Sequence, residues 1–224
     1  MAKPIQIAID GPAAAGKSTI AKIVAEKLGY IYIDTGAMYR AITLKAINQG
    51  IDLSSNEEAG ALLLETAIDL QPSTNGQLVF LDRKNVTEEI RTQVVTQAVS
   101  QMSAHGLVRE RMVELQQQLA EGRGVVMDGR DIGTHVLPNA PLKIFMSASV
   151  EERAARRFKE NKTRGIETPL HELQAEIAKR DKMDSEREVA PLKKAEDAIF
   201  LDTTTLTIQE AASEILKLAE ERLS

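Results

Sequence analysis

The sequence predicts an α/β fold, in which a five-stranded, mainly parallel sheet is covered by helices on both faces. Apolar, β-branched runs alternate with segments whose apolar residues recur at helical spacing. The connections between these runs are long enough for crossover helices, which favours parallel pairing of the strands. The candidate core strands, in chain order, are Gln6–Asp10, Tyr30–Asp34, Gly124–Asp128, Leu142–Ser147 and Ala198–Asp202.

The first strand runs into a glycine-rich turn and then an amphipathic segment. The turn reads Gly11-Pro12-Ala13-Ala14-Ala15-Gly16-Lys17-Ser18, which has the spacing G-x-x-x-x-G-K-[ST]. Such glycines let backbone N–H groups point at phosphate oxygens, and the following helix adds its positive end. Lys17 can reach the β- and γ-phosphates, and the Ser18 hydroxyl can ligate Mg²⁺. The alternative is a chance Lys-Ser in a strand-to-helix turn, but both flanks favour a P-loop that binds a nucleoside triphosphate.

Helix boundaries are marked along the rest of the chain. Capping-box patterns, a Ser or Thr followed three residues later by Glu, predict helix N-termini at Ser55, Ser149 and Thr207. The pair Thr168-Pro169 predicts an N-cap followed by Pro at the first helical position. Gly50 and Gly122 predict helix ends.

Two stretches interrupt the alternation. Between Leu70 and Glu89, the run Leu78–Leu81 indicates a strand with turns at Asn75-Gly76 and Asp82–Asn85, which predicts a small antiparallel sheet. The second stretch, Ser149–Pro191, is charged and helical, and its polar centre at residues 162–165 suits a mobile lid.

These interruptions divide the chain into three expected parts. The core comprises residues 1–38, 109–148 and 189–224. Residues 39–108 form an insert that contains the small antiparallel sheet. Residues 149–188 form an arginine-rich lid and the helix that follows it.

Composition narrows the class of protein. The chain has 224 residues, a net charge of −5 and no cysteine, which excludes disulfides and thiolate chemistry and argues against a general nucleic-acid partner. No apolar run approaches the ~20 residues that span a bilayer, so we expect no membrane partner and a cytoplasmic location. We also expect a monomer, which the acidic composition and short loops permit.

Charged residues follow the second and third strands, at the edge of the sheet where ligands bind. Arg40 lies on the helix after Asp34 and is either a site for a second anion or a surface arginine. Asp128 ends the third strand and either holds Mg²⁺ through water or caps the loop without touching metal. Arg130 and Asp131 follow it and could together bind a phosphate or a base edge.

A P-loop occurs in small-molecule kinases, in GTPase switches and in ATPases that remodel macromolecules. A GTPase should carry an Asn-Lys-x-Asp guanine site, which this sequence does not contain. A remodelling ATPase stays open, because sequence alone does not exclude a larger assembly. A kinase is favoured, because it needs an acceptor-binding insert and an arginine-rich lid that excludes water and neutralises γ-phosphate charge.

Six motifs spread over essentially the whole chain narrow this further. They are Gly11-Pro12-x-x-x-Gly16-Lys17, Asp34-Thr35-Gly36-Ala37-Met38-Tyr39-Arg40, Thr87-Glu88-Glu89-Ile90-Arg91, Asp128-Gly129-Arg130-Asp131-Ile132-Gly133-Thr134, Glu152-Arg153-Ala154-x-Arg156-Arg157 and Arg180-Asp181-x-x-Asp184-Ser185-x-Arg187. Together they resemble the motifs of the bacterial cytidylate kinases, in the P-loop nucleoside monophosphate kinase family. The insert resembles this family's enlarged monophosphate-binding domain.

The resemblance implies a P-loop NTPase fold and transfer of phosphate from ATP, with Mg²⁺, to CMP and dCMP. The expected ATP-binding residues are Gly11, Pro12, Ala13, Ala14, Ala15, Gly16, Lys17, Ser18 and Thr19. The expected catalytic residues are Lys17, Arg130, Arg153 and Arg157, with Arg153 and Arg157 closing from the lid onto the donor phosphates.

The resemblance also implies how the acceptor CMP is held. Arg40, Arg130 and Arg187 would hold its phosphate, with Arg180 nearby. Ser100, Arg109 and Asp131 would recognise the cytosine edge, and the Thr35 hydroxyl would contact the base. Arg180 and Asp184 would contact the sugar.

Overall fold

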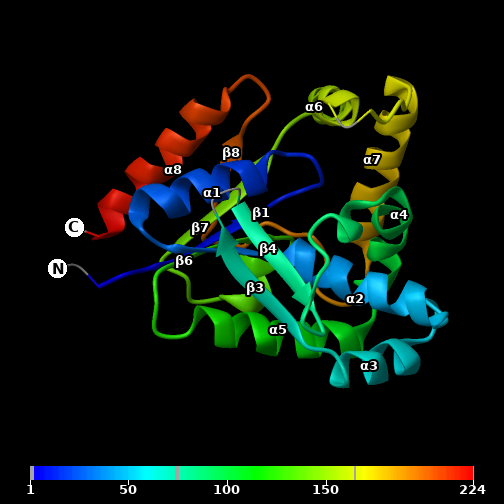
Figure 1. The fold of residues 1–224 in the computed structure, drawn as a ribbon. Coiled ribbons are helices and arrows are strands. Elements are labelled where there is room, and N and C mark those ends of the chain that lie inside the picture. The colour runs from blue at the N-terminus through cyan, green and yellow to red at the C-terminus, as the bar shows by residue number, and fades with distance from the viewer. Residues whose placement is uncertain (1–2, 74–75, 164, 224) are drawn as a thin grey trace.

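The computed structural model describes residues 3–73, 76–163 and 165–223 and has the expected α/β architecture (Figure 1). A parallel sheet has the strand order β2-β6-β1-β7-β8. Its strands are β1 (Gln6–Asp10), β2 (Ile31–Asp34), β6 (Val125–Gly129), β7 (Leu142–Ser147) and β8 (Ile199–Asp202). The predicted limits of β1 and β7 are confirmed; β2 and β8 begin one residue later than predicted, and β6 begins and ends one residue later. Tyr30 lies outside β2 because its amide donates to Ala25 O, 2.8 Å away, at the end of the preceding helix.

Helices cover both faces of this sheet, as predicted. In β1, Ile7 and Ile9 pack with α1 (Lys17–Leu28) and α8 (Ile208–Leu223). Ala8 points to the other face and packs in a second cluster with Ala120 of α5 (Gly106–Ala120). Figure 1 shows α1 and α8 together on one side of the sheet and α5 on the other. Burial of both faces explains why the core strands are continuously apolar.

The remaining helices surround the carboxyl end of the sheet. They are α2 (Thr35–Gln49), α3 (Asn56–Leu64), α4 (Gln93–Met102), α6 (Val150–Thr163) and α7 (Leu170–Glu186), with short turns η1 (Glu89–Arg91) and η2 (Ile132–Val136). None of the described helices is both long and apolar enough to cross a bilayer.

Ser55, Ser149 and Thr207 each accept from the amide three residues later, as predicted, but among the described residues only α8 also has the reciprocal bond that completes a capping box. Glu210 N donates to Thr207 Oγ1 at 3.2 Å, and Thr207 N donates to Glu210 Oε2 at 2.8 Å. Gly50 ends α2 with a φ of 67°, as predicted. The prediction at Thr168-Pro169 is wrong by one residue. Pro169 itself is the N-cap of α7, because its ψ of 143° is extended rather than helical.

The predicted end of α5 also differs slightly, because Gly122 lies one residue beyond the C-cap. Glu121 caps the helix with an extended φ and ψ, and Gly122 then turns the chain with a φ of +69°. A glycine is suited to that left-handed conformation, so it marks the turn rather than the cap.

The small antiparallel sheet is present and consists of β3 (Ile68–Ser73), β4 (Gly76–Leu81) and β5 (Lys84–Asn85). The expected turn over Asp82–Asn85 is shorter than predicted, because Asp82 and Arg83 make the turn with positive φ and the next two residues pair with β4. Asn75, in the other expected turn, lies outside the described residues. One face of this sheet packs on α2 through Val79 and Leu81.

Helices α6 and α7 form the segment expected to be the lid. They pack against each other through Ala154, Leu173 and Ile177, and Ala14 of the glycine-rich turn touches this cluster. Arg164, in the expected lid centre, lies outside the described residues. The segment is therefore joined by apolar contacts to the turn that follows β1.

Candidate functional site

The glycine-rich turn has the backbone shape that a phosphate-binding loop requires. Gly11 has a φ of +148°, and a Cβ there would lie 2.0 Å from Met146 O in β7. Gly16 has a φ of +87° and directly precedes α1. The turn therefore needs glycine at both positions, and it presents backbone N–H groups and a helix N-terminus on one side.

Lys17 is held inside this turn. Its side chain is buried, and Nζ donates to Pro12 O at 2.7 Å. Burial, together with the like charge of Arg130, lowers the pKa of Lys17 to about 7, although Asp128 and Asp10 oppose the shift. A cation held in a dry site interacts strongly with phosphate, because little water screens it.

Asp128 lies beside the first residues of α1. Ser18 Oγ donates to its Oδ2 at 2.9 Å, and Tyr32 OH donates to its Oδ1 at 2.8 Å. Burial and the nearby Asp34 carboxylate raise the pKa of Asp128 to about 6, against the opposing charge of Lys17. A hydroxyl and a carboxylate are the oxygen ligands that Mg²⁺ takes when nucleotide phosphates and water complete its shell, so these residues fit that ion.

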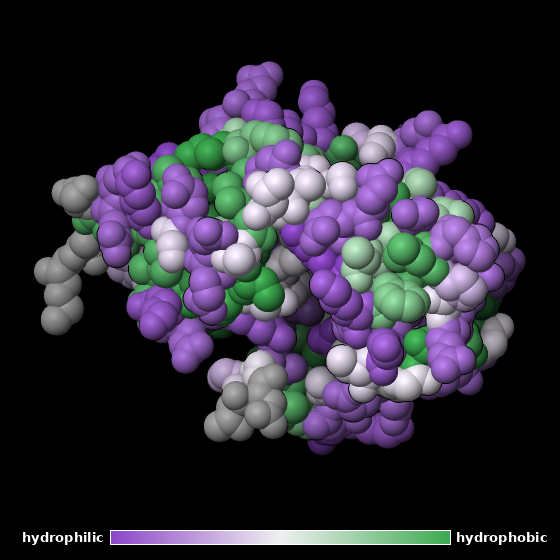
Figure 2. Space-filling view, turned by 90° about the horizontal axis from the view of Figure 1, so that it is seen from above, coloured by the Kyte–Doolittle hydropathy of each residue, from purple (hydrophilic) through white to green (hydrophobic). Residues whose placement is uncertain are grey.

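A cleft of about 1030 Å³ opens above the turn. Ala13 to Thr19 form one wall, and arginines from several elements form the others: Arg40 in α2, Arg91 in η1, Arg130 after β6, Arg157 in α6 and Arg180 in α7. Figure 2 shows hydrophilic side chains around the hollow near the middle of this face.

The arginines of the cleft repel one another. Burial and the neighbouring Arg180 lower the pKa of Arg40 to about 9, and burial and Arg130 lower the pKa of Arg180 to about 10. Arg40 has one strong neutral partner, because Nη1 donates to Thr96 Oγ1 at 2.8 Å. A multiply charged anion would relieve this repulsion, so the charge of the cleft suits phosphate groups.

A buried group of charges lies behind the cleft wall. Arg109 donates to Asp131 and to Ser103 O, and its guanidinium lies 5.4 Å from the centre of the Tyr39 ring. Arg187 Nη2 lies 3.7 Å from Asp131 Oδ1. Arg109 Nε and Arg187 Nη2 are buried and make no hydrogen bond within the described chain. Unused buried donors of this kind can serve a ligand.

Arg130 and Asp184 connect these two groups. Arg130 Nε donates to Asp184 Oδ2 at 2.8 Å, and Asp184 is itself buried. The pair fixes the direction of the Arg130 guanidinium, which lines the cleft beside Asp128 and Arg180.

The lid arginines differ from one another. Arg157 lines the cleft and pairs with Glu160, whereas Arg153 is buried and turned away from it. Arg153 donates to Ala13 O at 3.0 Å and to Asp181 Oδ2 at 2.6 Å, and so ties α6 to the P-loop and to α7. Arg156 was not among the predicted residues, yet it donates to Thr203 O at 2.5 Å. The i,i+4 spacing of Glu152 and Arg156 predicts that the two side chains share one face of α6, but it does not predict the contact of Arg156 with Thr203.

Not every predicted residue faces the cleft. Ser100 lines it, but Thr35 is buried and donates to Asp128 O at 2.7 Å. Gly11, Pro12, Arg109, Asp131, Arg153, Asp184 and Arg187 also lie outside the described lining.

Sequence reasoning also missed Asp10, Tyr32 and Gln77. Asp10 accepts from Ile132 N and Gly133 N and holds the turn after Asp131. Tyr32 stands two residues before Asp34, so strand alternation could have placed both on one face. Gln77 in β4 lines the cleft, and no sequence pattern indicated it.

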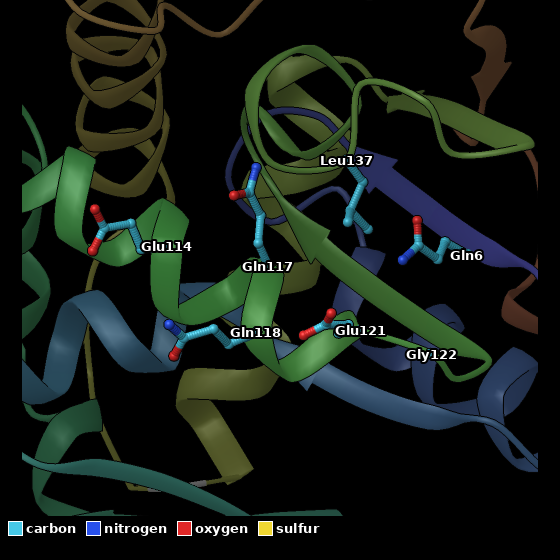
Figure 3. Close-up of a pocket in the computed structure, with 7 residues that line it drawn as sticks. All are labelled: Gln6, Glu114, Gln117, Gln118, Glu121, Gly122 and Leu137. Carbon is cyan, nitrogen blue, oxygen red and sulfur yellow. The ribbon is translucent and has the colours of Figure 1, made fainter.

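A second, smaller pocket of about 470 Å³ lies near the start of β1, at the other end of the strand from the P-loop. Figure 3 shows the side chains of Glu114, Gln117 and Gln118 on α5, and of Glu121 just after it, around this pocket. None of the described residues that line it is cationic, so it does not suit a phosphate.

Comparisons with known proteins agree with this geometry. Two solved structures share the fold at low identity: a gluconokinase from Sinorhizobium meliloti 1021 (TM-score 0.51, 15% identity, covering 100% of this chain and 95% of that chain) and an uncharacterised protein from Eubacterium ventriosum ATCC 27560 (TM-score 0.53, 13%, covering 96% and 98%).

The curated relatives are far more similar in sequence. A cytidylate kinase of Lysinibacillus sphaericus is 64% identical, over 100% of both chains, and one of Bacillus subtilis is 59% identical, over 99% of both. The family model for cytidylate kinase matches residues 7–221. A P-loop facing an arginine-lined cleft is what a phosphotransferase requires, and with a full-length match of this strength the chain belongs to the cytidylate kinase family.

Proposed function

We propose that this kinase transfers the γ-phosphate of ATP to CMP or dCMP, giving ADP and CDP or dCDP. The observation that carries the proposal is one cleft in which the P-loop faces arginines from α2, η1, α6, α7 and the loop after β6. Donor and acceptor phosphates repel each other, and a dense set of cations offsets that repulsion. An acceptor phosphate oxygen then attacks the γ-phosphorus in line, with no covalent enzyme intermediate.

The donor side is formed by the P-loop and the lid. Residues 11–19 would hold the ATP phosphates, with Lys17 on the β- and γ-phosphates. Arg157 faces the cleft and would neutralise charge on the transferred group. Arg153 would act indirectly, by keeping the P-loop and α7 in place, since it donates to Ala13 O and to Asp181. Ser18 and Asp128 would hold Mg²⁺, which shields the phosphate charge when it is bound.

The acceptor side is formed by the insert and the sheet edge. Arg40, Arg130 and Arg187 would hold the CMP phosphate, and Arg180 and Asp184 would contact the sugar. Ser100, Arg109 and Asp131 would recognise the cytosine edge, with the Nε of Arg109, which has no hydrogen-bond partner within the described chain, as one donor. The Thr35 hydroxyl donates to Asp128 O, so its lone pairs remain to accept from the cytosine amino group.

The same proposal gives each part of the chain a role, and we add to it a proposed assembly state. Residues 39–108 would serve as the monophosphate-binding insert, residues 149–188 as the lid and the rest as the core. We propose a monomer working in the cytoplasm, where its nucleotide substrates are available. Sedimentation should give a mass near 24.5 kDa with and without nucleotides, and a dimer mass would contradict the monomer.

The test of the proposed function is a coupled ADP-release assay with ATP and Mg²⁺ against CMP, dCMP, UMP, AMP, GMP and shikimate. Fast turnover with CMP and dCMP alone supports the proposal and its base-recognition residues. Fast turnover with another acceptor would agree with the P-loop assignment but would contradict the assigned contacts to the cytosine base. Slow ATP hydrolysis that no acceptor stimulates would contradict the kinase assignment.

A further inference from the structure

Gln77 of the small sheet bonds to the main sheet through both ends of its amide. Its Nε2 donates to Tyr32 O at 2.6 Å, and its Oε1 accepts from Asp34 N at 3.1 Å. The two partners are alternate residues of β2, and a single side-chain amide satisfies a backbone acceptor and a backbone donor of that strand.

These backbone groups lie on the outer edge of the sheet. β2 is an edge strand, paired only with β6 among the described strands. Unpaired edge groups would otherwise be left to water. Gln77 therefore takes, at one point, the place of a neighbouring strand on the outer edge of β2, and it joins two sheets between which the described strands form no ladder.

The strand that Gln77 holds leads directly to the donor side of the cleft. Tyr32, whose carbonyl Gln77 binds, also donates its hydroxyl to Asp128 Oδ1 at 2.8 Å. Asp128 Oδ2 accepts from Ser18 Oγ of the P-loop helix at 2.9 Å. Tyr32 therefore links the small sheet to the residues that fit Mg²⁺, because its carbonyl binds Gln77 and its hydroxyl binds Asp128.

The other end of this network is the acceptor side. The small sheet packs its apolar face on α2 through Val79 and Leu81, and α2 carries Arg40. Asp34, whose amide Gln77 binds, also caps α2, because its Oδ1 accepts from Ala37 N at 2.9 Å. The direction of α2, and so of Arg40, depends on the strand end that Gln77 holds.

We propose that Gln77 is a positioning residue, which clamps the insert to β2 and keeps the acceptor-binding arginine of α2 in register with the Tyr32–Asp128–Ser18 group on the donor side. This deepens the proposed function and rests on it. Gln77 has both ends of its amide engaged by backbone, so it acts through the strand rather than on the phosphates.

The test replaces Gln77 with Met, which keeps the length of the side chain and removes both hydrogen bonds. Gln71→Met is the matched control, because Gln71 is an exposed glutamine of the same sheet whose amide, among the described residues, bonds to Asp69 alone. Amide hydrogen exchange of Asp34, followed by NMR, reports the clamp without reference to activity. Steady-state kinetics then report KM for CMP and kcat, and a Gln77→Met/Tyr32→Phe double variant tests the coupling.

For Gln77→Met we expect Asp34 exchange to accelerate at least about tenfold, as for a lost hydrogen bond. We expect KM for CMP to rise about tenfold while kcat at saturation changes far less, because misplacement weakens acceptor binding. The loss in the double variant should be smaller than the product of the single losses, since both residues act in one network. Gln71→Met should change none of these quantities.

Three results would overturn the clamp. One is unchanged Asp34 exchange in Gln77→Met. The second is faster exchange with KM for CMP unchanged, which would make the bonds merely structural. The third is an equal effect of Gln71→Met. A wild-type protein with no CMP-dependent ADP release would instead overturn the proposed function and the acceptor side of the clamp, while Asp34 exchange would still decide whether Gln77 holds β2.

Discussion

Lys17 combines burial with a specific partner, since its Nζ is bound to Pro12 O inside the P-loop. Lys17→Ala removes the cation nearest the transferred phosphate, so we expect kcat to fall at least about 10²-fold. The melting temperature should change little, because the variant loses the contacts of Lys17 but no longer has to bury a charged group. The control is Lys27→Ala, an exposed lysine in the last turn of the same helix, which should keep wild-type turnover. Normal turnover by Lys17→Ala would contradict the P-loop assignment.

The pKa of Lys17 predicts a pH dependence. Because that pKa is about 7 in the free protein, kcat/KM for ATP should fall as pH rises through about 7. Bound phosphates favour the protonated lysine, so kcat should fall only at higher pH. Between pH 7 and 10.5 the unfolded chain binds more protons at Lys17, so this residue's contribution to the free energy of unfolding should increase with pH. A flat kcat/KM profile from pH 6.5 to 9 would contradict the shift.

Asp131 tests the assignment of base recognition. It is buried between Arg109 and Arg187, and Asp131→Asn changes its hydrogen-bonding capacity with little change of shape. We expect the kcat/KM ratio of UMP to CMP to rise at least about tenfold, because a site built for one hydrogen-bond pattern rejects another. We use the ratio because the variant also loses stability, and a smaller fraction of folded enzyme lowers the rates with both nucleotides equally. Asp197→Asn, at a solvent-exposed carboxylate, should leave the ratio unchanged.

At the scale of the element, capping determines where helices begin. The capping box of α8 is closed from both sides by Thr207 and Glu210, and α8 packs on the P-loop helix α1. Thr207→Ala should lower the free energy of unfolding by about 1 kcal/mol in urea titrations. KM for CMP should not change, because α8 lies on the face of the sheet away from the insert. Ser213→Ala, at an exposed position inside α8, is the control and should be near neutral.

The end of β1 holds the start of the short element η2 in place. Asp10 Oδ1 and Oδ2 accept from Ile132 N and Gly133 N at 2.8 and 2.7 Å, so the last residue of β1 holds the turn after β6. That turn carries Arg130 and Asp131. Burial raises the pKa of Asp10 to about 6, although the two backbone hydrogen bonds that hold its carboxylate act to lower it.

At the scale of the whole molecule, repulsion among arginines from several elements opposes folding, and anions relieve it. CMP at one hundred times its Kd should therefore raise the free energy of unfolding by about 2.7 kcal/mol. Cytidine, which lacks the phosphate, should raise the melting temperature far less at the same concentration. In Arg40→Gln, CMP and cytidine should raise the melting temperature by more similar amounts than they do in the wild-type protein. Equal effects of CMP and cytidine on the wild-type chain would contradict a phosphate site.

Local patterns in the sequence determined the P-loop, the α/β alternation, the side-chain N-caps at Ser55, Ser149 and Thr207, and the two interruptions. Each depends on residues within a few positions of one another, where spacing and backbone preference act directly. The glycines at 11 and 16 are one example, since the turn between strand and helix admits no side chain at Gly11.

The tertiary structure decided what depends on residues far apart in the chain. The sheet order β2-β6-β1-β7-β8 places Asp128 beside Ser18, 110 positions away. Packing turns Arg153 toward Ala13 rather than the cleft, commits the Thr35 hydroxyl to Asp128 O, and sets Gln77 against β2. No periodicity encodes such contacts, because they arise only once apolar burial has brought the sheet and its insert together.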